Sequence, residues 1–242
     1  MTFIPLHTAM ILAAGLGSRM HPLTDNYPKP MIKVRGKALI DWVLDDLAKN
    51  DITTAIVNVH YKAPLLIKHL AKRNIPNIII SDETELLLDT GGAVLAALPL
   101  VEDDLLLVTN SDALWGCGLG PAISTLLARW DDDIDSLILL APMRRAHGFD
   151  GAGDFFIEDN DTPVRRGKKP TAPYVYAGIQ IIHRRLFNKA PGGVFSFNAL
   201  WDKAHQEGRL KAALHDDDWY HVGTPDSVEQ TGQALKYNLA HT

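Results

Sequence analysis

The chain has 242 residues, of which 46% are apolar, a net charge of −5 and a single cysteine, Cys117. This length can bury the core of one large α/β domain, and the absence of a long basic run argues against a nucleic-acid partner. The lone cysteine excludes an intramolecular disulfide, and no apolar run approaches the roughly 20 residues that span a bilayer. With no secretory signal at the start either, we expect a soluble, cytoplasmic protein without a membrane partner; the oligomeric state stays open.

The first part of the chain, to about Pro142, alternates predicted strands with predicted helices. Apolar runs indicate buried strands, and apolar residues at helical spacing indicate amphipathic helices. The expected strands are 10–14, 55–59, 77–80, 105–108 and 136–140, and the expected helices are 37–49, 65–73, 92–98 and 120–130. This alternation predicts a Rossmann-like α/β fold, with a mostly parallel sheet and helices on both faces. Ligands of such sheets bind beyond the carboxyl ends of the strands.

After Met143 the pattern changes. Strands are expected at 155–157 and 174–182, separated by a turn-rich segment, and a helix at 196–206. Thr224-Pro225-Asp226 is a strong helix start, and that helix should run to about Leu239. No interior repeat or separating linker is visible. We therefore expect a single domain over 1–242, in which about 143–242 forms a smaller substrate lobe folded onto about 1–142.

A glycine-rich turn directly follows the first predicted strand. Gly15-Leu-Gly17-Ser18 can turn N–H groups outward, and such a nest of donors suits phosphate oxygens. Arg19 adds a planar fork, and Lys29 adds a mobile charge between two prolines. A Walker loop is absent, and Met20 stands where a dinucleotide fingerprint needs its third glycine. The pattern predicts a polyphosphate site of another kind.

The residues of this region resemble the signature of sugar-1-phosphate nucleotidyltransferases, Leu-Ala-Ala-Gly-x-Gly-x-Arg followed by Pro-Lys-Pro. Here residues 12–19 match the first part of the signature and Pro28-Lys29-Pro30 matches the second. The resemblance continues to Gly223-Thr224-Pro225 near the C-terminus. It is closest to the short bacterial N-acetylmuramate-1-phosphate uridylyltransferases and mannose-1-phosphate guanylyltransferase-like proteins. The resemblance implies a nucleotide-binding part over about 1–142 and a sugar-phosphate-binding part over about 143–242.

A carboxylate suited to a metal follows the most apolar strand. Asp112 closes the run Leu107-Val-Thr-Asn-Ser-Asp112, and a hard oxygen donor at a strand end suits Mg²⁺. The matching family aspartate is a metal ligand. The second metal aspartate of the family is replaced here by His221. Imidazole favours Mn²⁺ or Co²⁺ more than carboxylate does, so His221 is either a metal ligand or a contact to the sugar phosphate.

The resemblance also implies contacts to the two substrates. Nucleotide-binding residues would be Ala13, Ala14, Gly15, Gly17, Ser18, Arg19, Lys29, Gly91, Gly92 and Asn110, with Glu83 and Glu85 as further candidates for base or ribose. In Asp89-Thr-Gly-Gly92 the glycines would let the backbone approach the nucleobase. Sugar-phosphate-binding residues would be Asp154, Tyr176 and Gly178. The catalytic residues would be Arg19, Lys29 and Asp112.

The activity expected from the resemblance is transfer of a nucleoside monophosphate from a nucleoside triphosphate to a sugar 1-phosphate, with release of pyrophosphate. UTP with N-acetylmuramate 1-phosphate is the leading pair, and GTP with mannose 1-phosphate is the alternative. An alternative from another functional class is a nucleotide-binding regulatory protein without turnover. The replacement of a family metal ligand by His221 suggests this alternative. Met20 and the Pro-Lys-Pro run disfavour a nicotinamide dehydrogenase.

Overall fold

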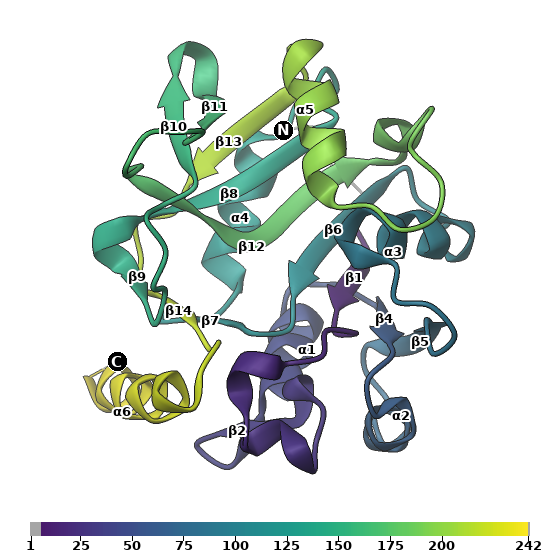
Figure 1. The fold of residues 1–242 in the computed structure, drawn as a ribbon, viewed down its shortest axis with the longest axis vertical. Helices are drawn as coiled ribbons and strands as arrows, with labels where there is room; N and C mark the ends of the chain where they lie inside the picture. Colours follow the sequence, from purple (N-terminus) through teal and green to yellow (C-terminus); the bar gives the residue numbers. More distant parts are fainter. Residues whose placement is uncertain (1–5, 242) are drawn as a thin grey trace.

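The structure, a computed structural model, describes residues 6–241 and is organised around a nine-stranded mixed sheet (Figure 1). Four strands from the first part of the chain are mutually parallel, in the order β6-β1-β4-β5. These are β1 (Thr8–Leu12), β4 (Thr54–Val59), β5 (Asn77–Asp82) and β6 (Leu105–Asn110). Their carboxyl ends meet at one edge, where the predicted phosphate loop begins.

The second part of the chain extends the same sheet. Beside β6 lies the antiparallel strand β12 (Tyr174–His183), which also pairs with β8 (Ser136–Pro142). The strand β13 (Leu210–Leu214) runs parallel to β8. A hairpin of β10 (Phe155–Glu158) and β11 (Thr162–Arg165) joins the sheet through the start of β12. The "lobe" of the second part is therefore continuous with the sheet of the first.

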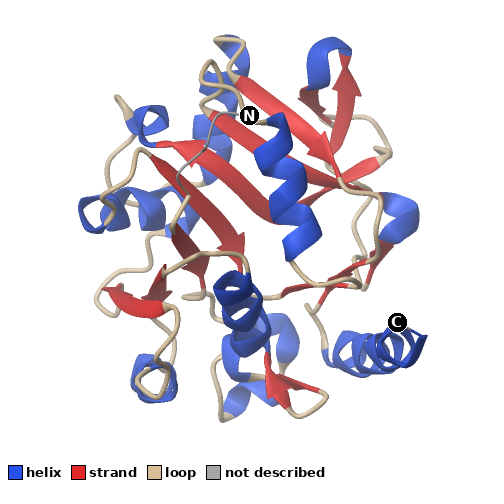
Figure 2. Ribbon diagram, turned by 180° about the vertical axis from the view of Figure 1, so that it is seen from behind, coloured by secondary structure: helices blue, strands red, loops and turns tan. Residues whose placement is uncertain are grey.

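Helices cover both faces of the sheet (Figures 1 and 2). One face carries α1 (Leu39–Lys49), α2 (Ala63–Leu70) and α4 (Gly120–Arg129), and the other carries α3 (Asp89–Ala97) and α5 (Phe197–Gln206). Strand residues alternate between these two cores: Ala9 and Ile11 of β1 lie in the first, and Met10 lies in the second. This arrangement buries both faces, as the continuous apolar runs predict.

A small three-stranded sheet lies beyond the carboxyl edge. It consists of β7 (Ala113–Trp115), β14 (Trp219–His221) and β9 (Ala146–His147), and a hairpin of β2 (Lys33–Val34) and β3 (Lys37–Ala38) lies nearby. Helix α6 (Pro225–His241) packs against β2. Short 3₁₀ turns occupy Ser18–Met20, Leu23–Asp25, Lys29–Met31, Leu98–Leu100, Met143–Arg145, Asp159–Asp161 and Arg184–Phe187. Within residues 6–241, no helix is long and apolar enough to cross a membrane.

The expected α/β fold with a mostly parallel central sheet is confirmed. The helix expected at 92–98 begins earlier, at Asp89, and the helix expected at 65–73 spans Ala63–Leu70 instead. The segment expected to be only a turn, 158–163, contains the start of β11. Strands β2, β3, β7, β9, β13 and β14 were not expected, because most are too short for a period to show in the sequence. The helix expected at 37–49 begins at Leu39, since Lys37–Ala38 forms β3.

Candidate active site

A cavity of about 580 Å³ opens at the carboxyl edge of the parallel strands. It is bordered by the turn after β1, the ends of β4 and β6, the start of α3, and two segments of the second part of the chain at Val194 and Gly223. Of the predicted nucleotide-binding and catalytic residues, the cavity is lined by Ala13, Ala14, Gly15, Gly17, Ser18, Arg19, Lys29, Asn110 and Asp112.

The glycine turn presents polar groups to this cavity. The N–H groups of Gly15, Leu16 and Gly17 have no hydrogen-bond acceptor within the described residues. Gly17 has a positive φ of 65°, and a Cβ there would approach Lys29 Cβ to 3.0 Å, so the turn requires glycine. Arg19 lies exposed at the rim with no ion pair inside residues 6–241. The turn and Arg19 are thus available to bind phosphate oxygens.

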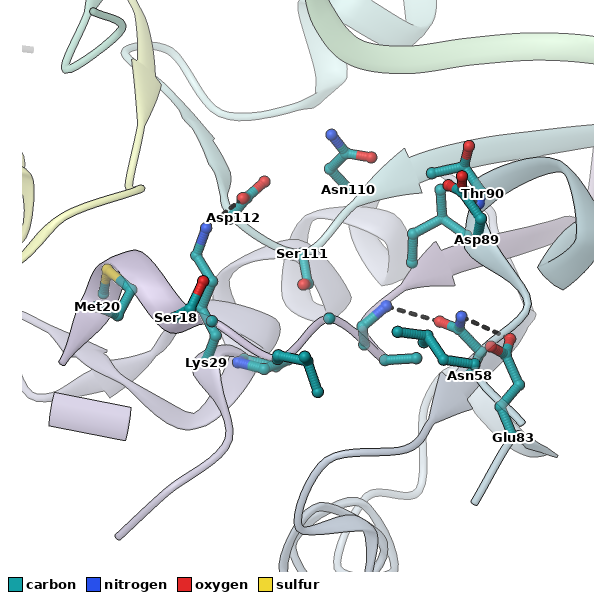
Figure 3. A pocket seen from close by; sticks show the side chains of 18 of the residues that line it. Ser18, Met20, Lys29, Asn58, Glu83, Asp89, Thr90, Asn110, Ser111 and Asp112 are labelled. Atoms are coloured by element: carbon teal, nitrogen blue, oxygen red, sulfur yellow. Dashed lines mark hydrogen bonds and ion pairs between the residues drawn. The ribbon is translucent and has the colours of Figure 1, made fainter. Parts of the chain in front are cut away.

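Lys29 and Asp112 form an ion pair in the cavity, although they are 83 residues apart in sequence. Lys29 Nζ donates to Asp112 Oδ2 at 2.5 Å, and the two side chains are 13% and 18% exposed (Figure 3). Burial opposes ionisation of Asp112, but the Lys29 ammonium outweighs it and holds the pKa of this carboxyl below its usual value. The site therefore contains an ionised carboxylate with a cation beside it.

His221 is brought to Asp112 by the small sheet. In the antiparallel pair of β7 and β14, His221 lies opposite Ala113, and Val222 N donates to Asp112 O at 2.9 Å. His221 Nδ1 consequently lies 3.9 Å from Asp112 Oδ2. Burial lowers the pKa of His221, against the opposing pull of the Asp112 carboxylate. The neutral ring, which can coordinate a metal, is favoured near neutral pH.

These two side chains fit a divalent ion. A carboxylate oxygen and an imidazole nitrogen face one another, and the ammonium of Lys29 already lies against the same oxygen that a metal would bind. The described residues hold no group of three or more His, Cys, Asp or Glu side chains suited to a metal. An ion here would take two ligands from this part of the chain and the rest from substrate and water, as Mg²⁺ commonly does.

A buried polar chain links the two walls of the cavity. Ala13 N donates to Asn58 Oδ1 at 2.6 Å, and Asn58 Nδ2 donates to Glu83 Oε1 at 2.8 Å (Figure 3). Glu83 Oε2 accepts from Leu88 N at 3.0 Å, and both Asn58 and Glu83 are 3% exposed. Glu83, a candidate contact to base or ribose, thus has both oxygens engaged. Asn58 was not predicted, although a polar residue inside an apolar strand was a usable signal.

Gly91 and Gly92 do not line the cavity. Their N–H groups both donate to Phe195 O, and a Cβ on either would collide with Phe195 or Gly193. These glycines let α3 pack closely against the loop before α5. Their neighbours Asp89 and Thr90 line the cavity instead (Figure 3).

The predicted sugar-binding residues lie outside the lining of the large cavity, on β12 and directly before β10. Asp154 and Tyr176 line a second cavity of about 320 Å³, where Tyr176 N donates to Asp154 Oδ2 at 3.1 Å. Burial raises the pKa of Asp154. Gly178 lies in a bulge of β12 with a φ of 75°, and a Cβ there would approach Asn110 Nδ2 to 3.0 Å. Gly178 therefore lies against Asn110, which lines the large cavity.

The chain is similar to known proteins in sequence and in fold. Residues 8–237 match the family described as Nucleotidyl transferase. The chain is 39% identical to N-acetylmuramate alpha-1-phosphate uridylyltransferase of Caulobacter vibrioides, and the match covers 90% of this chain and 93% of that protein. It is 31% identical to the enzyme of the same name from Neisseria meningitidis serogroup B, and that match covers 94% of this chain and 97% of that protein. The structure of the inositol-1-phosphate CTP transferase from T. maritima superposes with a TM-score of 0.80 over 96% of each chain at 16% identity, which shows the shared fold. The chain therefore belongs to the nucleotidyl transferase family of enzymes.

Proposed function

We propose that this protein transfers uridine monophosphate from UTP to N-acetylmuramate 1-phosphate and releases pyrophosphate. The observation that carries the nucleotidyl transfer is the meeting of the open glycine turn, Arg19 and the Lys29–Asp112 pair in one cavity. The choice of base and sugar is supported by the two uridylyltransferases to which the chain is 39% and 31% identical. Such a reaction would take place in the cytoplasm, where UTP is made.

The reaction needs positioning and charge neutralisation, and no covalent enzyme intermediate. The N–H groups of Gly15 to Gly17 would hold the phosphates of the triphosphate, and Arg19 would bind the leaving pyrophosphate. Lys29 would move from Asp112 to the α-phosphate and stabilise the charge that develops there. A divalent ion held by Asp112 and His221 would supply further neutralisation of the phosphates.

We propose a division of labour along the single domain. Residues of about 1–142 would bind the nucleotide, with Asn110 near its sugar-phosphate end and the Asn58–Glu83 chain behind the base. Residues of about 143–242 would bind the sugar phosphate through Asp154, Tyr176 and Gly178 and supply His221. Both parts border the large cavity, so the reacting phosphates would meet between them.

The test is a matrix of UTP, GTP, CTP and dTTP against N-acetylmuramate, N-acetylglucosamine and mannose 1-phosphates, with Mg²⁺, Mn²⁺ or Co²⁺ and pyrophosphate as the readout. We expect the highest kcat/KM for UTP with N-acetylmuramate 1-phosphate. A preference for GTP with mannose 1-phosphate would replace the proposed pair while retaining the reaction class. Triphosphate binding without pyrophosphate under any metal would instead support a regulatory role.

A further inference from the structure

The second cavity contains an arginine, Arg166, that forms no ion pair within the described residues; burial raises the pKa of the Asp154 carboxyl of the same cavity, and the Arg166 charge is near enough to oppose that shift. Arg166 lines this cavity, donates from Nε to Gly153 O and from Nη1 to Lys169 O, both at 2.9 Å, and is partly exposed. Both acceptors are backbone carbonyls, and Arg166 has no ion pair with any carboxylate in the described part of the chain. The two contacts hold the guanidinium in place and leave Nη2 directed to no protein acceptor within that part.

The neighbouring Arg165 lines the same cavity but is already engaged. Its Nε donates to Asp202 Oδ1 at 2.8 Å, and its Nη1 and Nη2 donate to Asn198 Oδ1 and Asn198 O. These bonds attach β11 to α5 and neutralise the charge of Arg165 locally. Arg166 is therefore the arginine of this cavity that can bind an incoming anion.

The position of the cavity relates this cation to the sugar ring. The segment from Val194 to Asn198 borders both cavities, with Val194 on the large one and Asn198 on the second. Along β12, Tyr176 lines the second cavity and Gly178 touches Asn110 of the first. Two residues of chain span at most about 7 Å, which is close to the width of a pyranose ring with its first substituents. A sugar with its 1-phosphate in the large cavity would thus direct its far substituents into the second.

We propose that Arg166 is a specificity-determining residue that binds a carboxylate carried by the sugar ring, so that the enzyme prefers acidic sugar 1-phosphates over neutral ones. The proposal rests on the nucleotidyl transfer proposed above. A guanidinium fork matches a carboxylate in shape and charge, and its two backbone contacts reduce the entropy lost on binding. Asp154, whose Oδ2 is engaged by Tyr176 N, offers its other oxygen to ring hydroxyls and not to the acidic group.

The experiment compares N-acetylmuramate 1-phosphate with its amide, which differs from it only in the acidic group, and with N-acetylglucosamine 1-phosphate. N-acetylmuramate 1-phosphate carries a lactyl ether that N-acetylglucosamine 1-phosphate lacks. In the amide of N-acetylmuramate 1-phosphate, a carboxamide replaces the lactyl carboxylate, which keeps the shape and removes the charge. With wild-type protein and UTP, we expect kcat/KM to be about 10- to 100-fold higher for the acidic sugar than for its amide, as for a lost charge-assisted bond. Equal values for acid and amide would overturn the proposal while leaving nucleotidyl transfer intact. No pyrophosphate with any substrate pair would remove the proposed function and this inference together.

Variants assign the effect to the residue. Arg166→Gln should remove the preference for the acidic sugar by raising its KM, with kcat/KM for N-acetylglucosamine 1-phosphate unchanged. Lys168→Gln is the matched control, because Lys168 is an exposed cation two residues away that does not line the cavity. Retained preference in Arg166→Gln, or an equal loss for both sugars, would contradict the assignment. If Arg166→Gln fails to fold, the amide comparison on wild-type protein and the partial preference expected of Arg166→Lys decide the question.

Discussion

Unlike Lys29, which pairs with Asp112, Arg19 does not contribute to the stability of the fold before substrate binds. Arg19 is exposed and makes no ion pair among residues 6–241, so Arg19→Ala should leave the melting temperature unchanged. Its loss removes a charge-assisted contact to the leaving group, and we expect kcat/KM to fall by about 100-fold. Pyrophosphate release at saturating UTP measures the effect. A variant that melts like wild type and also keeps its rate would show that Arg19 does not contact the reacting phosphates.

Asp112 has two roles that a substitution can separate. Asp112→Asn keeps the size of the side chain but loses the ion pair with Lys29 and the hard anionic ligand. We expect metal-dependent turnover to fall by about 100-fold or more, while binding of UTP without metal changes little, because the glycine turn is intact. Titration of Mg²⁺ into both proteins measures this. Equal activation of the variant and wild type by Mg²⁺ would rule out Asp112 as a ligand.

His221 is where the chain departs from the family pattern. Its Nδ1 lies 3.9 Å from Asp112 Oδ2, which is close enough for both atoms to hold one ion. If they do, Mn²⁺ or Co²⁺ should support a higher rate than Mg²⁺, and His221→Asp should shift the preference towards Mg²⁺. Rates across the three metals, with the melting temperature as control, provide the test. An identical metal profile in both proteins would leave His221 as a contact to the sugar phosphate.

At the level of elements, the Asn58–Glu83 chain fixes the spacing between the end of β1 and the start of α3. Asn58→Ala would leave Ala13 N and one oxygen of Glu83 buried without partners, which costs about 1–3 kcal/mol of unfolding free energy. Because these groups border the nucleotide side of the cavity, we expect a higher KM for UTP and an unchanged KM for the sugar phosphate. Asn77→Ala, at the exposed start of β5, is the control. A stability loss without a change in KM would make Asn58 purely structural.

The elements that the sequence predicts well are those with long apolar runs. β1, β4, β6 and β8 are buried on both faces, so their composition alone identifies them. The order of the strands in the sheet is harder to predict from the sequence. The segment of β12 is predicted as a strand, but its antiparallel insertion between β6 and β8 depends on contacts between distant segments. The same holds for β14, whose pairing with β7 brings His221 to Asp112.

The site shows the same division. Gly15, Gly17, Arg19 and Lys29 belong to one contiguous signature, so the sequence could place them in one site. Val194 and Asn58 line the cavity only because the chain returns to it, and no local pattern marks that return. Gly91 and Gly92 were expected at the nucleobase, but the structure uses their small size to pack α3 against the Phe195 loop.

At the scale of the whole molecule, one carboxylate ties three strands together at the edge opposite the site. The Asp135 side chain is 4% exposed and accepts from Arg185 Nε at 2.5 Å and Arg209 Nε at 2.6 Å. Its backbone bonds to His183 and Arg209 join the starts of β8 and β13 to the end of β12. Asp135→Asn should therefore lower the unfolding free energy at pH 7 by about 1–3 kcal/mol. A fully buried ion pair would contribute more, but both arginines are partly exposed and solvent screens their charges. Urea denaturation measures the loss, and kcat at 25 °C should be unaffected.

The pH dependence of stability provides a separate test of the ion pairs of Asp135 with Arg185 and Arg209. Burial opposes ionisation of Asp135, but Arg209 and Arg185 outweigh it and lower its pKa from 3.8. A carboxyl whose pKa is lower in the folded state stabilises the protein above its unfolded pKa and loses that contribution as pH falls through the folded value. The stability difference between wild type and Asp135→Asn should thus be constant above about pH 5 and shrink below pH 4. Asp133→Asn, on the same turn but exposed, should show neither effect. A difference that persists undiminished at pH 2 would mean that Asp135 acts through packing and not through its charge.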